Sequence, residues 1–228
     1  MQQLSFNFSF EDNYLTEDFL ITKSNQNAAD FVLNYKSNNI SSPKIFGICG
    51  PESSGKTHLA HIWKRNFGAS FLNPDTSENY NFVNYIKPEN FYIIEDLDQI
   101  RHQENLLHIY NLIYEENCFL MITSKINLQN IKFTIPDLAS RLKNIFYTII
   151  NQPDEELIKM LLIKNFSLKQ LNVTENIINY LSKNIERNFS TINKIVKILE
   201  FYCFEEKREI TLPLAAKALK TINPNLIL

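Results

Sequence analysis

The feature that most constrains this chain is an octapeptide at residues 50–57, Gly-Pro-Glu-Ser-Ser-Gly-Lys-Thr, which matches the pattern G-x-x-x-x-G-K-[ST]. Glycines let backbone N–H groups of such a loop turn inward around a phosphate, and the lysine reaches the phosphate oxygens. The threonine hydroxyl is a ligand for Mg²⁺. The chain has only four glycines, and two of them hold motif positions. We therefore predict a nucleotide-binding loop formed by Gly50, Ser53, Ser54, Gly55, Lys56 and Thr57.

The residues on either side of this loop have the periodicities of a strand and a helix. Residues 44–49 read as a buried strand, and Leu59, Ile62 and Trp63 recur on one face of a helix expected at 56–65. Further strands are expected at 71–72, 91–94, 118–123 and 146–150, with helices at 27–35 and 106–115. Strands that alternate with helices form a parallel sheet covered on both faces, so the fold class is α/β.

The pattern changes after residue 150. Pro153, Asp154 and the two glutamates that follow are typical of a helix start, since proline fits the first turn and acids favour its dipole. Helices are expected at 155–169, 174–184, 190–206 and 212–220, with no strand between them. We predict a terminal segment at 1–10, a nucleotide-binding α/β domain at 11–151 and a small all-helical domain at 152–228.

Composition excludes several classes of protein. The net charge is −2 and the pI is near 6.1, which argues against a long nucleic acid as the main partner. No apolar run is long enough for a membrane span, and the first ten residues lack the features of a signal peptide. The three cysteines are far apart in sequence, which argues against a disulfide scaffold or a cysteine metal site. We expect a soluble cytoplasmic protein with no membrane partner.

Two acids follow the apolar strand expected at 91–94. Glu95 and Asp96 stand where a nucleotide-binding site of this kind carries carboxylates, one to orient Mg²⁺ and the next to polarise water. The alternative is an ordinary acidic turn after a core strand. We predict that Thr57 and Glu95 hold the metal and that Asp96 is catalytic. Glutamate replaces the commoner aspartate at the metal position.

These motifs together resemble the AAA+ ATPases and, among them, the DnaA family of replication initiators. The resemblance lies in the phosphate loop, in residues 17–29 and in a third strand that ends in Ser124. It also includes residues 135–142, which are similar to the stretch that carries the arginine finger of that family. The resemblance implies that ADP or ATP binds with Mg²⁺ where the sheet meets the helical lid, near Phe19, Leu20 and Ser124. It also implies that Arg141 acts in trans on the nucleotide of a neighbouring subunit.

The sequence stops after the helical lid, as in truncated, Hda-like members of the DnaA family. Such proteins begin with a peptide that binds the DNA polymerase sliding clamp, and the segment Gln3-Leu4-Ser5-Phe6-Asn7-Phe8 is similar to that peptide. The resemblance implies that Gln3 forms hydrogen bonds while Leu4, Phe6 and Phe8 fill a groove of the clamp. The alternative is a terminal strand that packs on the core of this same chain.

The expected function is that of a DnaA-related adaptor. It would bind adenine nucleotide, dock on the sliding clamp and promote hydrolysis of the ATP bound to DnaA, which limits replication initiation. The chain itself would be at most a weak ATPase, because Ser190 stands where the family carries a sensor arginine, with Arg187 one turn earlier. Ser190 is expected to cap the helix that follows it. The resemblance also leaves room for a homodimer and includes no sequence-specific DNA binding.

Two other classes remain open from the sequence. A helicase loader of the DnaC or IstB kind would bind single-stranded DNA, which the low arginine content and the pI disfavour. A small-molecule kinase would carry arginines in its lid to clamp phosphates, and here the C-terminal helices supply only Arg187 and Arg208. The four histidines lack a completing set of ligands, so structural or surface roles are expected for them.

Overall fold

A computed structural model describes residues 14–36, 42–76, 82–206 and 209–223. Within these ranges the strands form one parallel sheet in the order β2-β3-β4-β1-β5. The strands are β1 (Ile45–Cys49), β2 (Ser70–Phe71), β3 (Phe91–Ile94), β4 (Phe119–Ser124) and β5 (Phe146–Ile149). Because all of them run the same way, their carboxyl ends lie along one edge of the sheet, and the residues that follow them meet there.

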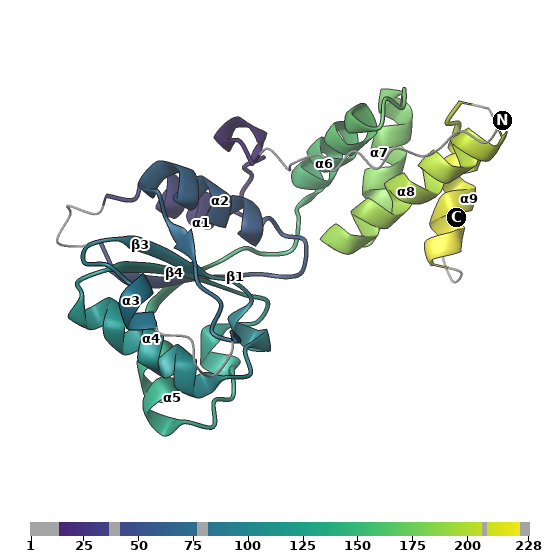
Figure 1. Cartoon of the computed structure of the whole chain (residues 1–228). Helices are drawn as coiled ribbons and strands as arrows, with labels where there is room; N and C mark the ends of the chain where they lie inside the picture. Colours follow the sequence, from purple (N-terminus) through teal and green to yellow (C-terminus); the bar gives the residue numbers. More distant parts are fainter. Residues whose placement is uncertain (1–13, 37–41, 77–81, 207–208, 224–228) are drawn as a thin grey trace, which may run out of the picture.

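Helices cover both faces of this sheet (Figure 1). One face carries α1 (Gln26–Leu33) and α2 (Lys56–Phe67), and the other carries α3 (Phe82–Tyr85), α4 (Gln103–Glu115) and α5 (Pro136–Lys143). Short 3₁₀ helices occur at η1 (Thr16–Asp18), η2 (Leu97–Gln99) and η3 (Leu128–Asn130). This architecture confirms the predicted α/β class. The periodicity of the sequence did not identify α3 or α5 as helices.

The alternation of side chains along β1 divides the interior into two clusters. Phe46 and Ile48 pack with Trp63 under α1 and α2, whereas Ile45 and Cys49 belong to the cluster under α4 and α5. This is the period of two that a strand buried on both faces requires. Trp63 is fully buried, and its indole N–H has no hydrogen-bond partner among the described residues. The loop between β1 and α2 therefore rests on elements that are packed from both sides.

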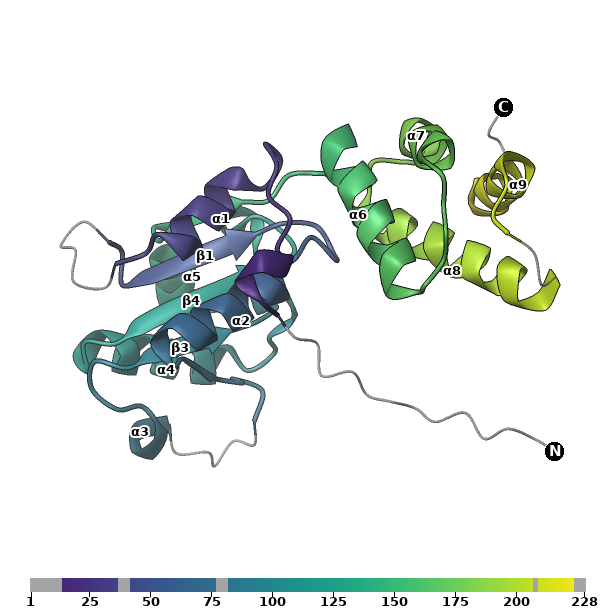
Figure 2. The ribbon, with the colours of Figure 1, turned by 90° about the horizontal axis from the view of Figure 1, so that it is seen from above.

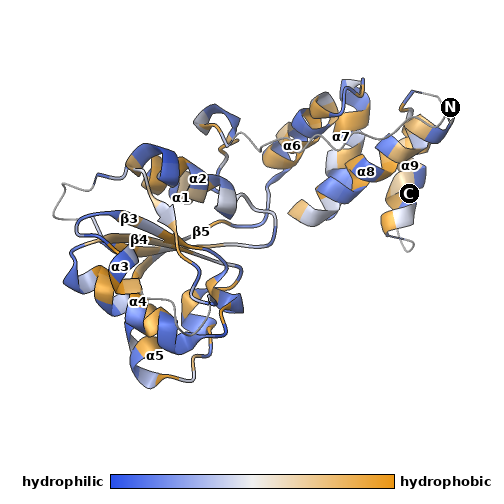
Figure 3. Cartoon of the chain, in the orientation of Figure 1, coloured by the Kyte–Doolittle hydropathy of each residue, from blue (hydrophilic) through white to orange (hydrophobic). Residues whose placement is uncertain are grey.

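The chain continues after the sheet as α6 (Glu155–Leu168), α7 (Glu175–Asn184), α8 (Phe189–Glu206) and α9 (Leu212–Ile222). We call these elements the helical part. In two perpendicular views α6 and the start of α8 lie nearest the sheet, and α9 lies with the far end of α8 on the side away from it (Figures 1 and 2). Figure 3 shows both hydrophilic and hydrophobic colours on each of these helices, and their buried apolar residues form a separate cluster that includes Ile158, Leu181 and Leu199. The predicted C-terminal helical region is confirmed.

Two apolar side chains and one acid join the helical part to the sheet. Leu157 on α6 and Phe189 at the start of α8 are buried in the same cluster as Trp63. Asp154 caps α6 by accepting a hydrogen bond from the N–H of Leu157 (2.8 Å), and its other carboxylate oxygen accepts one from the N–H of Ser24 (3.2 Å). The segment before α1 therefore contacts both parts of the molecule.

Residues 1–10, including Gln3, Leu4, Phe6 and Phe8, lie outside the described residues. The prediction of a clamp-binding peptide at these positions therefore stays a prediction. Among the described helices, none combines the length and the apolar character that a membrane span requires.

Candidate functional site

The phosphate loop connects β1 directly to α2. Gly55 is the first residue before α2 and has a φ of +94°, in the left-handed region that favours glycine. A Cβ at Gly55 would lie 2.8 Å from Cε2 of Phe19, and one at Gly50 would lie 2.9 Å from both Cβ of Ile150 and Oγ of Ser54. Both glycines of the motif are therefore required by close packing, and at Gly55 also by backbone conformation.

Lys56 is the centre of the loop. Its side chain is only 6% exposed, and its ammonium donates hydrogen bonds to the carbonyl oxygens of Gly50 and Pro51, both at 2.8 Å. Burial lowers the pKa of Lys56, and the charges of Asp96 and Asp98 oppose that shift. The loop thus carries a buried cation whose present acceptors are neutral backbone carbonyls.

The residues after β3 and β4 converge on the same loop. The N–H of Gly50 donates to the carbonyl oxygen of Ser124 (3.1 Å), and the N–H of Asp96 donates to Oγ1 of Thr123 (3.1 Å). Asp96 has a φ of +49°, so the chain turns sharply there. Oδ1 of Asp98 accepts hydrogen bonds from Oγ of Ser124 (3.0 Å) and the N–H of Lys125 (2.7 Å). These bonds fix the ends of three neighbouring strands against one another.

A cavity of about 1010 Å³ opens beside the loop, which is enough volume for a nucleotide. The phosphate loop, the strand ends, the segment before α1 and the helical part all contribute to its lining. The lining residues are Tyr14, Asp18, Glu52, Ser53, Ser54, Gly55, Lys56, Thr57, His58, Asp96, Lys125, Lys164, Asn165, Leu168, Lys169 and Asn193.

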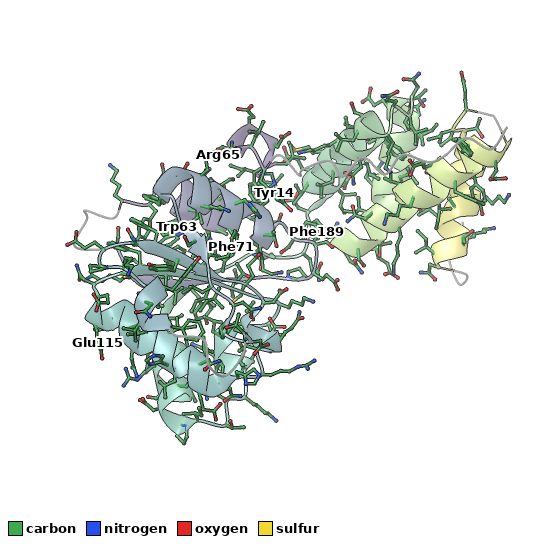
Figure 4. All side chains as sticks on the ribbon, in the orientation of Figure 1. Tyr14, Trp63, Arg65, Phe71, Glu115 and Phe189 are labelled. Atoms are coloured by element: carbon green, nitrogen blue, oxygen red, sulfur yellow. The ribbon has the colours of Figure 1, made fainter. Side chains whose placement is uncertain are left out.

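The segment before α1 approaches the cavity through contacts with histidines of α2. The ring of Tyr14 stacks on His61 with centroids 4.1 Å apart, and Nε2 of His58 donates to the carbonyl oxygen of Leu15 at 2.8 Å. Burial lowers the pKa of His58, although its hydrogen bond to Leu15 acts in the opposite direction. Figure 4 labels Tyr14 beside α2 and Phe189 where the helical part meets the sheet. His58 therefore fixes the path of the chain beside the cavity.

The helical part contributes polar side chains to the other wall. The ammonium of Lys164 donates to the carbonyl oxygen of Asp18 (2.8 Å) and lies 3.2 Å from its carboxylate. Lys169 forms an ion pair with Glu200 at 3.0 Å. The amide of Asn165 donates to the side chain of Asn193 at 3.2 Å. These contacts were not foreseen from the sequence, because they depend on how α6 and α8 dock.

The cap of α8 differs from the expectation. Oδ1 of Asn188 accepts hydrogen bonds from Oγ of Ser190 (2.8 Å) and from the N–H of Thr191 (3.1 Å). The helix begins at Phe189, so Ser190 already lies in its first turn. The prediction that Ser190 caps the helix was therefore wrong, and Asn188 has that role. Arg187 is exposed and is not among the residues that line the cavity.

The structure brings part of the predicted site together. Ser53, Ser54, Gly55, Lys56, Thr57 and Asp96 all line the cavity. The other predicted residues are not among the described lining residues of this cavity: Gly50, Phe19, Glu95, Ser124 and Leu20, of which Leu20 lines a separate pocket beside α6. Phe19 packs against Gly55, and the hydroxyl of Ser124 donates to Asp98 and to the carbonyl oxygen of Ile126.

Arg141 lies elsewhere, on α5, and is not a lining residue of this cavity. Its Nε donates to Oδ1 of Asp137 at 2.8 Å, and its guanidinium lies over the ring of Tyr110, 5.6 Å from the centroid. The hydrogen bond to Asp137 raises the pKa of Arg141, and the side chain is 39% exposed. Arg141 thus lies part-exposed on α5, paired with Asp137 and outside the lining of the cavity.

The residues present fit the phosphates of a nucleotide together with Mg²⁺. Oγ of Ser54 is buried in the loop and has no hydrogen-bond partner among the described residues, although buried hydroxyls normally have one. A phosphate oxygen would supply that acceptor and would also replace the carbonyls that now bind Lys56. Thr57 and Asp96 line the cavity and offer the hydroxyl and carboxylate oxygens that Mg²⁺ prefers.

Comparison with known proteins extends this description. No protein-family model matches the chain. Its sequence is 24% identical to the chromosomal replication initiator protein DnaA of Borreliella burgdorferi over 231 residues, which covers 92% of this chain and 48% of that protein. It is 27% identical to DnaA of Caldanaerobacter subterraneus over 239 residues, which covers 93% and 53%. The chain thus spans about half the length of the curated relatives it matches.

Solved structures give the same result for the fold. Domain III of Thermotoga maritima DnaA matches with a TM-score of 0.76 at 19% identity, covering 92% of this chain and 97% of that one. AMPPCP-bound DnaA from Aquifex aeolicus matches with a TM-score of 0.65 at 22% identity, covering 85% and 67%. A Thermotoga maritima RuvB variant matches with a TM-score of 0.66 at 14% identity, covering 88% and 68%. The chain is a distant sequence relative of DnaA and has the AAA+ fold of DnaA domain III and RuvB, as the resemblance implied.

Proposed function

We propose that this chain binds an adenine nucleotide and Mg²⁺ in the cavity beside the phosphate loop. Two buried groups of the loop carry this proposal. The ammonium of Lys56 donates to loop carbonyls, and the hydroxyl of Ser54 has no partner among the described residues. Both groups gain a charged acceptor when a phosphate enters the loop. Two solved DnaA structures with this fold contain AMPPCP, an adenine nucleotide analogue, which supports the choice of ligand.

In this proposal each residue of the cavity has a defined task. Backbone N–H groups of the loop and the ammonium of Lys56 bind the β-phosphate, and the start of α2 adds its positive dipole. The sequence predicted Thr57 and Glu95 as the metal ligands and Asp96 as the catalytic acid. Because Thr57 and Asp96 line the cavity and Glu95 is not among its described lining residues, we propose instead that Thr57 and Asp96 would hold the Mg²⁺, which would neutralise phosphate charge when bound. His58 and Tyr14 border the same cavity from α2 and from the segment before α1. Those two residues hold the chain segment against which the base would rest.

We further propose a role in DNA replication as a DnaA-related adaptor. Arg141 supports this role because it lies outside the cavity of its own chain and is part-exposed. An arginine in that position is available to the γ-phosphate of ATP bound to another protein, where it stabilises the charge of the transition state. Contacts with Asp137 and Tyr110 already restrict the Arg141 side chain. It would therefore lose less conformational entropy when it binds a partner. The partner we propose is DnaA carrying ATP.

The remaining element is a clamp-binding peptide at Gln3, Leu4, Phe6 and Phe8, outside the described residues. The proposal assigns these side chains to a groove of the DNA polymerase sliding clamp, which would place the adaptor in the cytoplasm at the replication machinery. Burial of each apolar side chain contributes about 1.5–3 kcal/mol, offset by ordering of the peptide.

The test of the adaptor role is a single-turnover assay of ATP hydrolysis by DnaA with purified clamp and this protein. We expect stimulation by the wild type, a loss of about 100-fold or more with Arg141→Ala, and no loss with Arg101→Ala, an exposed arginine elsewhere on the surface. The double variant Leu4→Ala/Phe6→Ala should lose clamp binding and stimulation together while Arg141→Ala retains clamp binding. If the wild type gives no stimulation and instead binds single-stranded DNA, the helicase-loader class replaces the adaptor.

A further inference from the structure

Lys125 occupies a position next to the phosphate loop that the sheet fixes. It follows β4 directly, and β4 pairs with β1 so that Ser124 lies opposite Cys49. The N–H of Gly50 donates to the carbonyl oxygen of Ser124 at 3.1 Å, which joins the two strand ends. Lys125 therefore follows the end of β4, directly beside the end of β1 from which the phosphate loop starts.

The backbone of Lys125 is held in place, but its ammonium has no acidic partner. Its N–H donates to Oδ1 of Asp98 at 2.7 Å, and the side chain is half-buried and lines the cavity. In the described part of the chain, no carboxylate lies within ion-pair distance of its Nζ. Lys164 and Lys169, which line the same cavity, are paired with Asp18 and Glu200.

Lys56 and Lys125 thus line the same cavity, and neither has a carboxylate within ion-pair distance among the described residues. Lys125 is near enough to Lys56 for its charge to lower the pKa of Lys56, after the larger effect of burial. The charges of Asp96 and Asp98 raise that pKa, and the acids that line the cavity are Asp18, Glu52 and Asp96. Like charges held close together by the fold are relieved when an anion lies between them. The phosphates of a nucleotide are such an anion.

We infer that Lys125 is a second phosphate-binding cation, which contacts the β- or γ-phosphate and makes nucleotide binding by this chain less dependent on Mg²⁺. The inference rests on the proposed nucleotide binding and adds a residue that determines its metal dependence. An ammonium beside the phosphates supplies part of the charge neutralisation that Mg²⁺ otherwise supplies. The hydrogen-bonded backbone fixes where the Lys125 side chain starts, and its flexible stem lets the ammonium reach a phosphate.

Calorimetric titration of the full chain with ADP, once with Mg²⁺ and once with EDTA, tests this inference. The variants are Lys125→Gln, Lys125→Arg to keep the charge, and Lys132→Gln as a control at an exposed lysine outside the cavity lining. In EDTA we expect Lys125→Gln to bind ADP about tenfold more weakly than the wild type. With Mg²⁺ present the difference should shrink to about threefold or less, because the ion replaces the missing charge. Lys125→Arg and Lys132→Gln should match the wild type in both buffers.

Three results would overturn the inference. Equal ADP affinity of Lys125→Gln and wild type in EDTA would show that the ammonium does not contact the phosphates. Equal losses in Lys125→Arg and Lys125→Gln would show that charge is not the property that matters. A wild type that binds no ADP in either buffer would refute the proposed nucleotide site itself, and this inference with it. Thermal melts of each variant confirm that the protein tested is folded.

Discussion

The sheet and the helical part supply the two walls of the cavity, and they hold their cations in opposite ways. Lys56, at the end of β1, is almost fully buried and is bound by two backbone carbonyls. Lys164 on α6 is paired with the carboxylate of Asp18 and also donates to its carbonyl oxygen, and Lys169 just after α6 is paired with Glu200; both side chains remain partly exposed. Backbone acceptors packed on a sheet cannot move far, whereas exposed ion pairs contribute little and exchange partners easily.

This difference indicates that the two walls have different roles, one in ligand binding and the other in stability. The wall that belongs to the sheet is built before any ligand arrives, because strand pairing sets the positions of the phosphate loop, Asp96 and Lys125. The wall that belongs to the helical part depends on a small joint formed by Leu157, Phe189 and Asp154. We therefore expect substitutions in the first wall to change ligand affinity and substitutions in the joint to change stability.

The largest effect is expected at Lys56. Lys56→Ala removes the charge-assisted contact to the phosphates, so ADP affinity measured by calorimetry should fall about a thousandfold or below detection. The matched control is Lys64→Ala, an exposed lysine on the same helix. Unchanged ADP affinity in a folded Lys56→Ala protein would contradict the expectation that the wall belonging to the sheet determines ligand affinity.

The joint is tested at Phe189, which is 5% exposed in the cluster under α1 and α2. Phe189→Ala should lower the free energy of unfolding by about 3–5 kcal/mol in denaturant titrations, because it leaves a cavity between the two parts. Phe204→Ala, on the same helix but 82% exposed, should cost less than about 0.5 kcal/mol. Similar costs for both variants would mean that the helical part does not depend on this contact.

The smallest effect is expected at Asp154. Burial favours its neutral form, but hydrogen bonds from Leu157, Thr22 and Ser24 and the charge of Lys23 together lower its pKa. Because the folded pKa lies below the unfolded value of about 3.9, the contribution is fully present above that pH and is lost as the pH falls through the folded pKa. It should amount to about 1 kcal/mol or less, since the group is partly exposed.

Asp154→Asn keeps an oxygen that can cap α6 but lacks the charge. Its free energy of unfolding should therefore fall less steeply than that of the wild type between about pH 5 and pH 3. Asp30→Asn, an exposed aspartate on α1, serves as the comparison. A wild-type slope in Asp154→Asn would show that the acid joins the two parts without electrostatic stabilisation.

The sequence predicted the parts of the site that depend on local pattern. The phosphate loop, β1 and α2 follow one another in the chain, so motif and periodicity determine them together. Lys125 and Lys164 carry no motif, and they reach the cavity only because β4 pairs with β1 and α6 docks on the segment before α1. Whether Asn188 or Ser190 caps α8 depends on the first residue of that helix, and a shift of one residue changes the answer. The helix begins at Phe189, which is buried in the sheet cluster, and the sequence pattern did not show that contact.

The buried environment of Trp63 has a spectroscopic consequence. It is the single tryptophan of the chain, and its side chain lies on α2, fully buried against the sheet and α1, without a hydrogen bond from its indole N–H to the described residues. Indole fluorescence shifts to longer wavelength when the ring meets water, so its emission reports the opening of the cluster between the sheet, α1 and α2, to which the helical part adds only Leu157 and Phe189 among its buried residues. Circular dichroism, by contrast, reports every helix in the molecule. Superimposable melting curves from the two signals mean one cooperative unit, and an earlier loss of ellipticity means that the helical part unfolds first.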